Sequence, residues 1–399
     1  MDTQLEHARF AKILLLLNFL VSLHLFVGVY INSSFLETLI PIEQIGIIFT
    51  LGAFIAFFFL SQAEKFLIWF GEIKIVLVLL FLDMLGLLVL TAFSFFELHI
   101  NSIAIIFSFL LHYVSAAYLI RFVLDVHYEE HMSNKQTGLL RGEILTTAHI
   151  AAIFSPLIFS QLLTNSDFWK IYALSFVIGL GILTILLLHF PKEKKQEYNN
   201  VFFFNTLKKV FNDKTLYRGF MISFIFHFSG SWIVIYLPIY LHKFIGFSWE
   251  QIGFLFTVML IPYVLVDIPL GYIADRWIPE QKIVSIGFII ISLATLPIAF
   301  ININSFLVWV IVLSLARFGF GTIQVMNDSY FFKHVSAFDG NLISFFRSAH
   351  PLAYIFGPLI ASFLLATEIF EIQHLFIVLA FIMLSGLAYS LPLKKAGTY

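Results

Sequence analysis

Long apolar stretches alternate with short polar ones along the whole chain. Twelve of these stretches are about 20 residues long, the length that crosses the hydrocarbon core of a bilayer as a helix. Backbone groups find no water in lipid, so each stretch must be a helix that satisfies its own hydrogen bonds. The predicted spans are 11–31, 42–60, 73–96, 103–126, 142–165, 168–190, 218–241, 251–273, 283–303, 306–327, 342–366 and 372–391.

The basic residues gather in every second loop. With the N-terminus placed inside, the inner loops and ends hold all of the 23 Lys and Arg side chains except Lys170, Lys243 and Arg317. Cytoplasmic loops carry such an excess of positive charge. We therefore expect a multi-pass protein of the cell membrane with both termini in the cytoplasm, which requires an even number of spans.

An octapeptide at the start of the second predicted span returns at the start of the eighth. Residues 43–50 read EQIGIIFT and residues 250–257 read EQIGFLFT. Phe-Ser-Pro-Leu-Ile at 154–158 likewise returns as Phe-Gly-Pro-Leu-Ile at 356–360. Asp125, Tyr128 and His131 return as Asp328, Phe331 and His334.

These echoes keep one order and nearly one offset, which indicates a duplicated unit. Six spans is an even number, so both copies enter the membrane the same way and form parallel repeats. We predict a six-helix bundle over 1–190, a linker over 191–216 and a second six-helix bundle over 217–399. The linker segment VFFFNTLKKVF places Phe204, Leu207 and Phe211 on one helical face. It is either a helix on the inner leaflet or a plain connection.

Composition narrows the function. The chain is 60% hydrophobic and 12% charged, against about 25% charged in soluble domains. Its net charge of −1 gives no basic field for nucleic acid, and the absence of cysteine excludes disulfides and thiolate sites. No phosphate-binding G-x-x-x-x-G-K-S/T loop occurs, so we expect no ATP site. We also expect no metal and no cofactor.

Three local motifs complete the picture. The loop after span 8 reads Gly271-Tyr-Ile-Ala-Asp275-Arg276, and span 10 contains Arg317-Phe-Gly-Phe-Gly. The proline positions in spans 5 and 11 are the third. With the twelve spans and the duplication, they resemble the major facilitator superfamily of secondary transporters over nearly the whole length. The resemblance implies an all-α fold of two pseudo-symmetric bundles, with spans 1, 4, 7 and 10 lining a central cavity.

The resemblance also implies a cytoplasmic gate. The family carries G-x-x-x-D-R/K in the loop after span 8, and the loop after span 2 keeps an acid and a base but not the glycine. An acid–base pair there can hold one conformation and release the other; ordinary solvated loop charge is the alternative. The gate residues would be Glu64, Lys65, Gly271, Asp275 and Arg276.

Polar side chains near the middle of the spans are the candidate site, because charge is costly at mid-bilayer. His24, His112, His227 and Arg317 fall one on each of spans 1, 4, 7 and 10, so they are the predicted substrate contacts. Each histidine alone could simply bond a neighbouring helix. The guanidinium needs an anion, either the substrate or a protein carboxylate. The carboxylates considered are Asp83, Asp267 and Asp328.

Asp83 is the carboxylate closest to the centre of a span. A carboxylate or imidazole whose proton affinity changes between two conformations can carry a proton. We therefore predict proton coupling through Asp83, His149 and His350, with a structural hydrogen bond between spans as the alternative role for Asp83.

These features predict a secondary active transporter that moves a small organic solute, anionic or polar, by alternating access with protons. We expect a monomer embedded in lipid. One alternative is a receptor or scaffold built on the transporter fold. Another is a metallopeptidase, because His127, Glu130 and His131 fit H-x-x-E-H with two imidazoles one helical turn apart. The repeated copy keeps only the last histidine, so we expect no enzyme and no catalytic residue.

Overall fold

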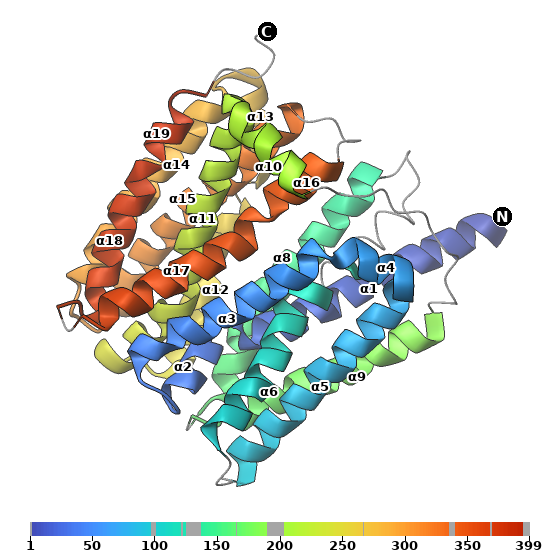
Figure 1. Cartoon of the computed structure of the whole chain (residues 1–399). Helices are drawn as coiled ribbons and strands as arrows, with labels where there is room; N and C mark the ends of the chain where they lie inside the picture. Colours follow the sequence, from blue (N-terminus) through green and yellow to red (C-terminus); the bar gives the residue numbers. More distant parts are fainter. Residues whose placement is uncertain are drawn as a thin grey trace. The chain divides into compact units, whose positions relative to one another are not determined.

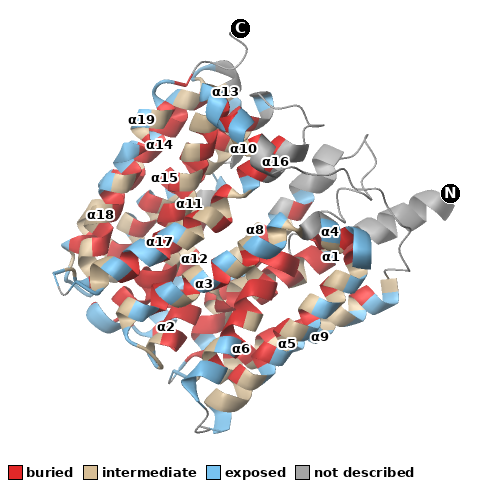
Figure 2. Ribbon diagram, viewed as in Figure 1, coloured by how far each residue is buried: buried red, intermediate tan, exposed pale blue. Residues whose placement is uncertain are grey.

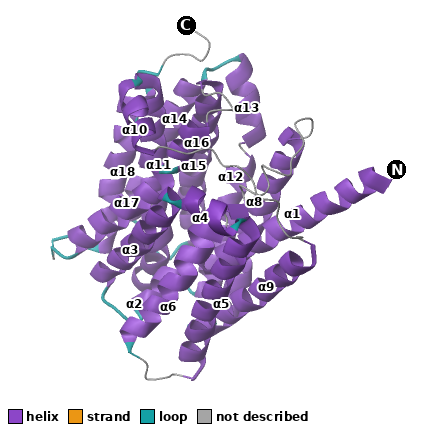
Figure 3. Ribbon diagram, turned by 45° about the vertical axis from the view of Figure 1, so that its right-hand side comes forward, coloured by secondary structure: helices purple, strands orange, loops and turns teal. Residues whose placement is uncertain are grey.

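The computed structural model describes residues 2–96, 101–120, 123–124, 137–164, 166–189, 203–265, 267–334, 340–367 and 369–393. All of its regular structure there is helical, and no strand occurs among these residues (Figure 3). Ten helical segments are long and apolar enough to cross a membrane. Two shorter apolar helices, Thr146–Leu162 and Trp249–Pro262, fall on predicted spans 5 and 8. The predicted all-α polytopic fold is confirmed.

The chain forms two compact units, which Figure 1 shows as two groups of helices. Unit 1 comprises Met1–Leu39 and Phe58–Asn199, and unit 2 comprises Ile40–Phe57 and Asn200–Tyr399. The helices of unit 1 are α1 (Asp2–Val29), α2 (Asn32–Glu37), α4 (Ala63–Phe70), α5 (Glu72–Phe96), α6 (Ser102–Val114), the π-helix η1 (Ser115–Leu119), α8 (Thr137–Leu162) and α9 (Phe168–His189).

Unit 2 takes most of α3 (Ile42–Ser61) in addition to the second half of the chain. Its other elements are α10 (Phe203–Asn212), α11 (Lys214–Ile239), the π-helix η2 (Tyr240–Phe244), α12 (Trp249–Leu265), α13 (Asp267–Arg276), α14 (Glu280–Thr295), the 3-10 helix η3 (Leu296–Ala299), α15 (Phe306–His334), α16 (Gly340–Arg347), α17 (Ala349–Leu365), α18 (Ile372–Ser385) and α19 (Leu387–Ser390).

Helix packing repeats between the units. In unit 1, α1 packs on α8 and α9, and α5 packs on α6 and α9. In unit 2, α11 packs on α17 and α18, and α14 packs on α15 and α18. In both units the first predicted span packs on the fifth and sixth, and the third packs on the fourth and sixth. The sequence echoes therefore belong to two copies of one packing arrangement.

Each unit buries an apolar core and leaves large apolar side chains on its outer surface (Figure 2). In unit 1 the core includes Leu17, Leu80 and Ile182, and in unit 2 it includes Trp232 and Phe288. Exposed phenylalanines such as those at 54, 81 and 363 would be unfavourable in water. They are the surface that a bilayer solvates, which is the normal arrangement of a membrane protein.

The linker segment contains the helix α10, and its predicted place on the inner leaflet stays a prediction. Val210 is buried and Leu207 is partly buried against a cluster that includes Phe220 and Phe345. Phe211 instead has 57% of its surface exposed, next to the exposed Lys208. The inward face of this helix is therefore set by Leu207 and Val210, with Phe211 turned outward, which differs from the predicted face.

Small residues allow a close contact between α14 and α15 in unit 2. A β-carbon at Gly319 of α15 would lie 2.9 Å from the backbone nitrogen of Ile291 and 3.0 Å from the carbonyl oxygen of Gly287, both on α14. In lipid, helices associate through such backbone-to-backbone packing. The first glycine of the Arg317-Phe-Gly-Phe-Gly motif is therefore required by the α14–α15 contact.

This contact predicts the effect of a larger residue. Gly319→Val forces a side chain against two backbone atoms, so we expect the fold to lose about 1–3 kcal/mol and the melting temperature to fall. The measurement is thermal unfolding of the purified protein in detergent. Gly219→Val on α11 is the control, because a β-carbon there meets nothing within 4 Å. Equal melting temperatures for the two variants would contradict the assignment.

Candidate functional site

The centre of unit 1 holds a buried polar cluster made by three helices. His24 of α1, Asp83 of α5 and His112 of α6 are 2%, 0% and 3% exposed. The Oδ2 atom of Asp83 lies 2.7 Å from Nε2 of His24, and its Oδ1 atom lies 2.7 Å from Nδ1 of His112. One carboxyl group thus joins two imidazoles, which meet edge to face with centroids 5.8 Å apart.

The hydrogen bonds of His24 fix where its protons are. Its Nδ1 lies 2.9 Å from the backbone carbonyl oxygen of Ser175 on α9. A carbonyl only accepts, so Nδ1 must carry a hydrogen. The bond between Nε2 and Asp83 then needs a second proton, either on the ring or on the carboxyl group. If both groups lost it, two lone pairs would face each other at 2.7 Å. The geometry therefore holds one proton shared by His24 and Asp83.

Close helix packing brings these side chains together. A β-carbon at Gly86, one turn after Asp83, would lie 2.5 Å from the carbonyl oxygen of Ser108 and 3.1 Å from the backbone nitrogen of His112. Glycine at this position lets α5 approach α6 closely enough for a short Asp side chain to reach an imidazole. Directly after α6 the helix widens into η1. Single π-turns of this kind are frequent at functional sites.

A second polar layer lies beside His112. The ring of Tyr172 on α9 stands edge to face with that of His112, at a centroid distance of 6.3 Å. The Tyr172 hydroxyl donates to Oδ1 of Asn32 at 3.3 Å. Asn32 is 5% exposed and opens α2. Polar groups therefore continue from the cluster toward the start of α2.

The cluster also has the donor set of a small cation site, with three ligand atoms within 4.8 Å of one another. Its distances indicate hydrogen bonds instead. Ligands at about 2.0–2.2 Å in tetrahedral positions around zinc stand roughly 3.3 Å apart. The two nitrogen–oxygen distances here are 2.7 Å, the length of a charge-assisted hydrogen bond. A shared proton fits this arrangement without any movement.

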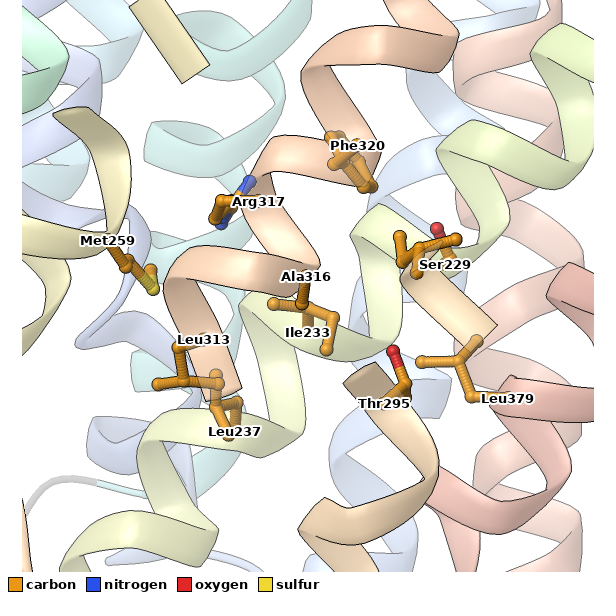
Figure 4. A pocket seen from close by; sticks show the side chains of 11 residues that line it. Ser229, Ile233, Leu237, Met259, Thr295, Leu313, Ala316, Arg317, Phe320 and Leu379 are labelled. Atoms are coloured by element: carbon orange, nitrogen blue, oxygen red, sulfur yellow. The ribbon is translucent and has the colours of Figure 1, made fainter. Parts of the chain in front are cut away.

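Unit 2 holds the predicted arginine beside a small cavity. Its walls come from α11, α12, α14, α15 and α18, and Ser229, Thr295 and Arg317 are their polar members (Figure 4). The guanidinium carbon of Arg317 stands 5.3 Å from the ring centroid of Phe320, one turn further along α15. The cavity volume is about 20 Å³, which is room for about one water molecule.

The second pair of predicted histidines lies in unit 2. His227 of α11 and His350 of α17 meet edge to face with ring centroids 4.8 Å apart. The Tyr354 ring follows His350 at 4.7 Å. Both imidazoles are half-buried. His227, a predicted substrate contact, therefore lies against His350, a predicted proton-coupling residue.

The contacts of the mid-span histidines and Asp83 cross the two predicted roles. The sequence separated the substrate contacts His24 and His112 from the coupling residue Asp83, whereas the structure joins them. His149 lies on α8, half-buried. Among the carboxylates considered for Arg317, Asp83 has both oxygens on imidazoles, and Asp328 interacts electrostatically with Arg347 of α16. The side chain of Asp267 is outside the described residues.

The predicted gate is described only in part. Lys65 is exposed, and its Nζ donates to Oε1 of Gln62 at 2.8 Å. Gly271, Asp275 and Arg276 lie on α13, but their side chains and that of Glu64 are outside the described residues. The metallopeptidase motif is also outside the described residues; it comprises His127, Glu130 and His131.

Two buried acids escaped the sequence analysis. Glu280 opens α14, is 3% exposed and forms an ion pair with Lys333 near the end of α15. Glu72 opens α5, the corresponding helix of the first repeat, and is also 3% exposed. Acids are favourable in the first turn of a helix. The shared place of the two glutamates in the duplication was a signal available in the sequence.

Comparison with known proteins agrees with this architecture. The sequence model of the family described as the Major Facilitator Superfamily matches residues 14–337 and, in a second match, residues 220–398. The chain belongs to the major facilitator superfamily, and it is a multi-pass membrane transporter of that family. The members of this class are generally not enzymes.

Two solved structures show the same fold. The nucleoside transporter NupG, solved as a single-substitution mutant, superposes with a TM-score of 0.74 at 13% identity, over 96% of this chain and 100% of NupG. The POT family transporter PepTSo superposes with a TM-score of 0.70 at 12% identity, over 96% of this chain and 97% of PepTSo. No curated protein sequence matches the chain.

The cluster predicts a large effect of truncating Asp83. Asp83→Ala strands two imidazole N–H groups in the core of unit 1, at a cost of about 1–3 kcal/mol each, so the melting temperature should fall markedly. Asp167→Ala is the matched control, because the side chains of Asp167 and of its ion-pair partner Lys170 are each 30% exposed. An ion pair exposed to this degree contributes at most about 1 kcal/mol to stability. If both variants unfold at one temperature, the cluster does not hold its helices together.

Proposed function

We propose that this chain is a proton-coupled secondary transporter of a small organic solute that works by alternating access. It would function as a monomer in the cell membrane with both termini in the cytoplasm. The observation that carries the proposal is the buried arrangement of His24, Asp83 and His112. A transporter needs a group that takes up a proton in one conformation and gives it up in another, and this cluster is built from such groups.

The free-energy cost of burying the Asp83 charge supports a role for the cluster in proton coupling. Asp83 is fully buried, so its charge is stable only while imidazole protons compensate it. Three separate helices supply the three side chains. A movement that separates α6 from α5 would break the short hydrogen bond between His112 and Asp83 and release or recruit a proton. Helix movement and proton binding are thereby linked through one set of contacts.

The polar groups of unit 2 support a second role, contact with the solute. Arg317, Ser229 and Thr295 line one cavity, and His227 and His350 add two imidazoles on neighbouring helices. A guanidinium inside a membrane protein favours a carboxylate, a phosphate or another anionic group. His24 and His112 were predicted as solute contacts from the family arrangement, and we assign them instead to the proton site together with Asp83.

Glu64, Lys65, Gly271, Asp275 and Arg276 would form the cytoplasmic gate, as the family motif implies. The ion pair of Glu280 with Lys333 joins α14 to α15 close to that motif in sequence. It would hold this end of unit 2 together while the loop charges separate. His149 and His350 remain candidates for a further step of proton transfer.

The solute is the first thing to identify. A thermal-shift screen of the purified protein would begin with organic anions, which suit the guanidinium of Arg317, and continue with nucleosides, the substrate class in the name of NupG. We expect a stabilising ligand whose effect is lost in Arg317→Ala and partly kept in Arg317→Lys. Stabilisation that survives unchanged in Arg317→Ala would remove Arg317 from the binding site.

Proton coupling is tested with that solute in proteoliposomes. Acid outside should accelerate uptake if the solute and proton move together, and slow it if they move in opposite directions. Asp83→Asn should abolish the response to the pH gradient while solute exchange at equal pH continues, because the amide keeps the shape of the carboxyl group but binds no proton. Asp167→Asn is the control. A pH response that persists in Asp83→Asn refutes coupling through this cluster.

A further inference from the structure

The two imidazoles of the cluster are not equivalent. His24 uses both ring nitrogens, one on the Ser175 carbonyl oxygen and one on Asp83. The carbonyl oxygen cannot pass a proton onward, so His24 is closed on that side. His112 uses Nδ1 on Asp83, and its Nε2 has no hydrogen-bond partner in the described part of the chain. One nitrogen of the cluster is therefore available to exchange a proton.

The surroundings of this nitrogen are polar on one side. The Tyr172 ring contacts the ring of His112, and its hydroxyl leads to Asn32. The next two residues, Ser33 and Ser34, are 0% and 6% exposed, and their hydroxyls lack partners among the described residues. Buried hydroxyls without partners are unusual in proteins, and an ordered water is the usual way to satisfy them. The polar series from α2 to His112 is therefore the polar side of the cluster.

Within the described residues, three titratable groups face His112. Asp83 faces it from α5, His24 from α1 and Tyr172 from α9. On its own helical segment, the hydroxyls of Tyr113 and Tyr118 bond each other at 3.1 Å. The acid in contact with His112 is therefore Asp83, whose other oxygen shares a proton with His24.

We propose that Nε2 of His112 is the port through which the coupling proton enters and leaves, and that His24 is a positioning residue. This inference rests on the proposed function and names the atom that performs it. A proton adds to the Nε2 lone pair and makes His112 an imidazolium, whose Nδ1–H continues to donate to Asp83. Loss of the same proton from Nε2 restores the neutral ring. The proton shared by His24 and Asp83 stays in place.

Nitrogen NMR of the imidazoles tests the port without a known solute. The full chain is labelled with 15N-histidine in lipid nanodiscs and titrated between about pH 5 and 8, where imidazoles change charge. We expect the Nε2 signal of His112 to move between its protonated and unprotonated positions while its Nδ1 stays protonated. His24 should keep both ring signals unchanged. The opposite pattern, with His24 titrating and His112 constant, would overturn the proposal.

Two variants assign the signals and extend the test to transport. His112→Gln and His24→Gln each remove one set of signals, and Asn replaces Gln wherever the Gln variant does not fold. In proteoliposomes, His112→Gln should lose the response to a pH gradient. His24→Gln should retain a response of the same sign at a lower rate, because the port is intact. Loss of the response in Asp83→Asn but not in His112→Gln overturns the port alone. A response that persists in both removes coupling by the cluster as well.

Discussion

Lipid cannot hydrate a charge, and the arrangement of unit 1 follows from that constraint. Asp83 is stable at the centre of the bundle because each of its oxygens shares a short hydrogen bond with an imidazole. Those bonds in turn fix how α1, α5 and α6 approach one another. Gly86 is needed so that the backbones come close, and the Ser175 carbonyl is needed so that the His24 ring is held in one orientation. One buried carboxyl group thus sets packing, geometry and proton content together.

Much of the fold could be read from the sequence because the bilayer imposes one length and one kind of helix. Twelve apolar stretches and three echoes were enough to predict two related bundles. The same four helix pairings in both units are the physical basis of those echoes. Breaks within spans were beyond the sequence signal. The π-helix that directly follows α6 depends on local packing that hydrophobicity does not record.

The sequence drew attention to the polar residues at mid-span but could not predict which of them are in contact. Histidines and an aspartate at mid-span had to be partnered, and that reasoning found His24, Asp83 and His112. Whether these three side chains meet depends on how α1, α5 and α6 are oriented about their axes. That orientation is set by glycine contacts and cannot be predicted from composition. The buried glutamates at the starts of α5 and α14 were overlooked because they lie at helix ends, where charge usually meets water. Only the comparison of the two repeats distinguishes them from ordinary loop charges.

The assignment of residues 40–57 to unit 2 has a consequence for biosynthesis. Gly46 of α3 packs against the carbonyl oxygen of Pro358, and Thr50 donates to that of Ile355 at 3.0 Å. The ribosome therefore delivers α3 some three hundred residues before the helix that receives it. During that interval its glycine face must be covered by lipid or by an insertion factor. Cutting the gene at the central linker would separate α3 from its binding surface, so the two halves would have to find each other again before either could become complete.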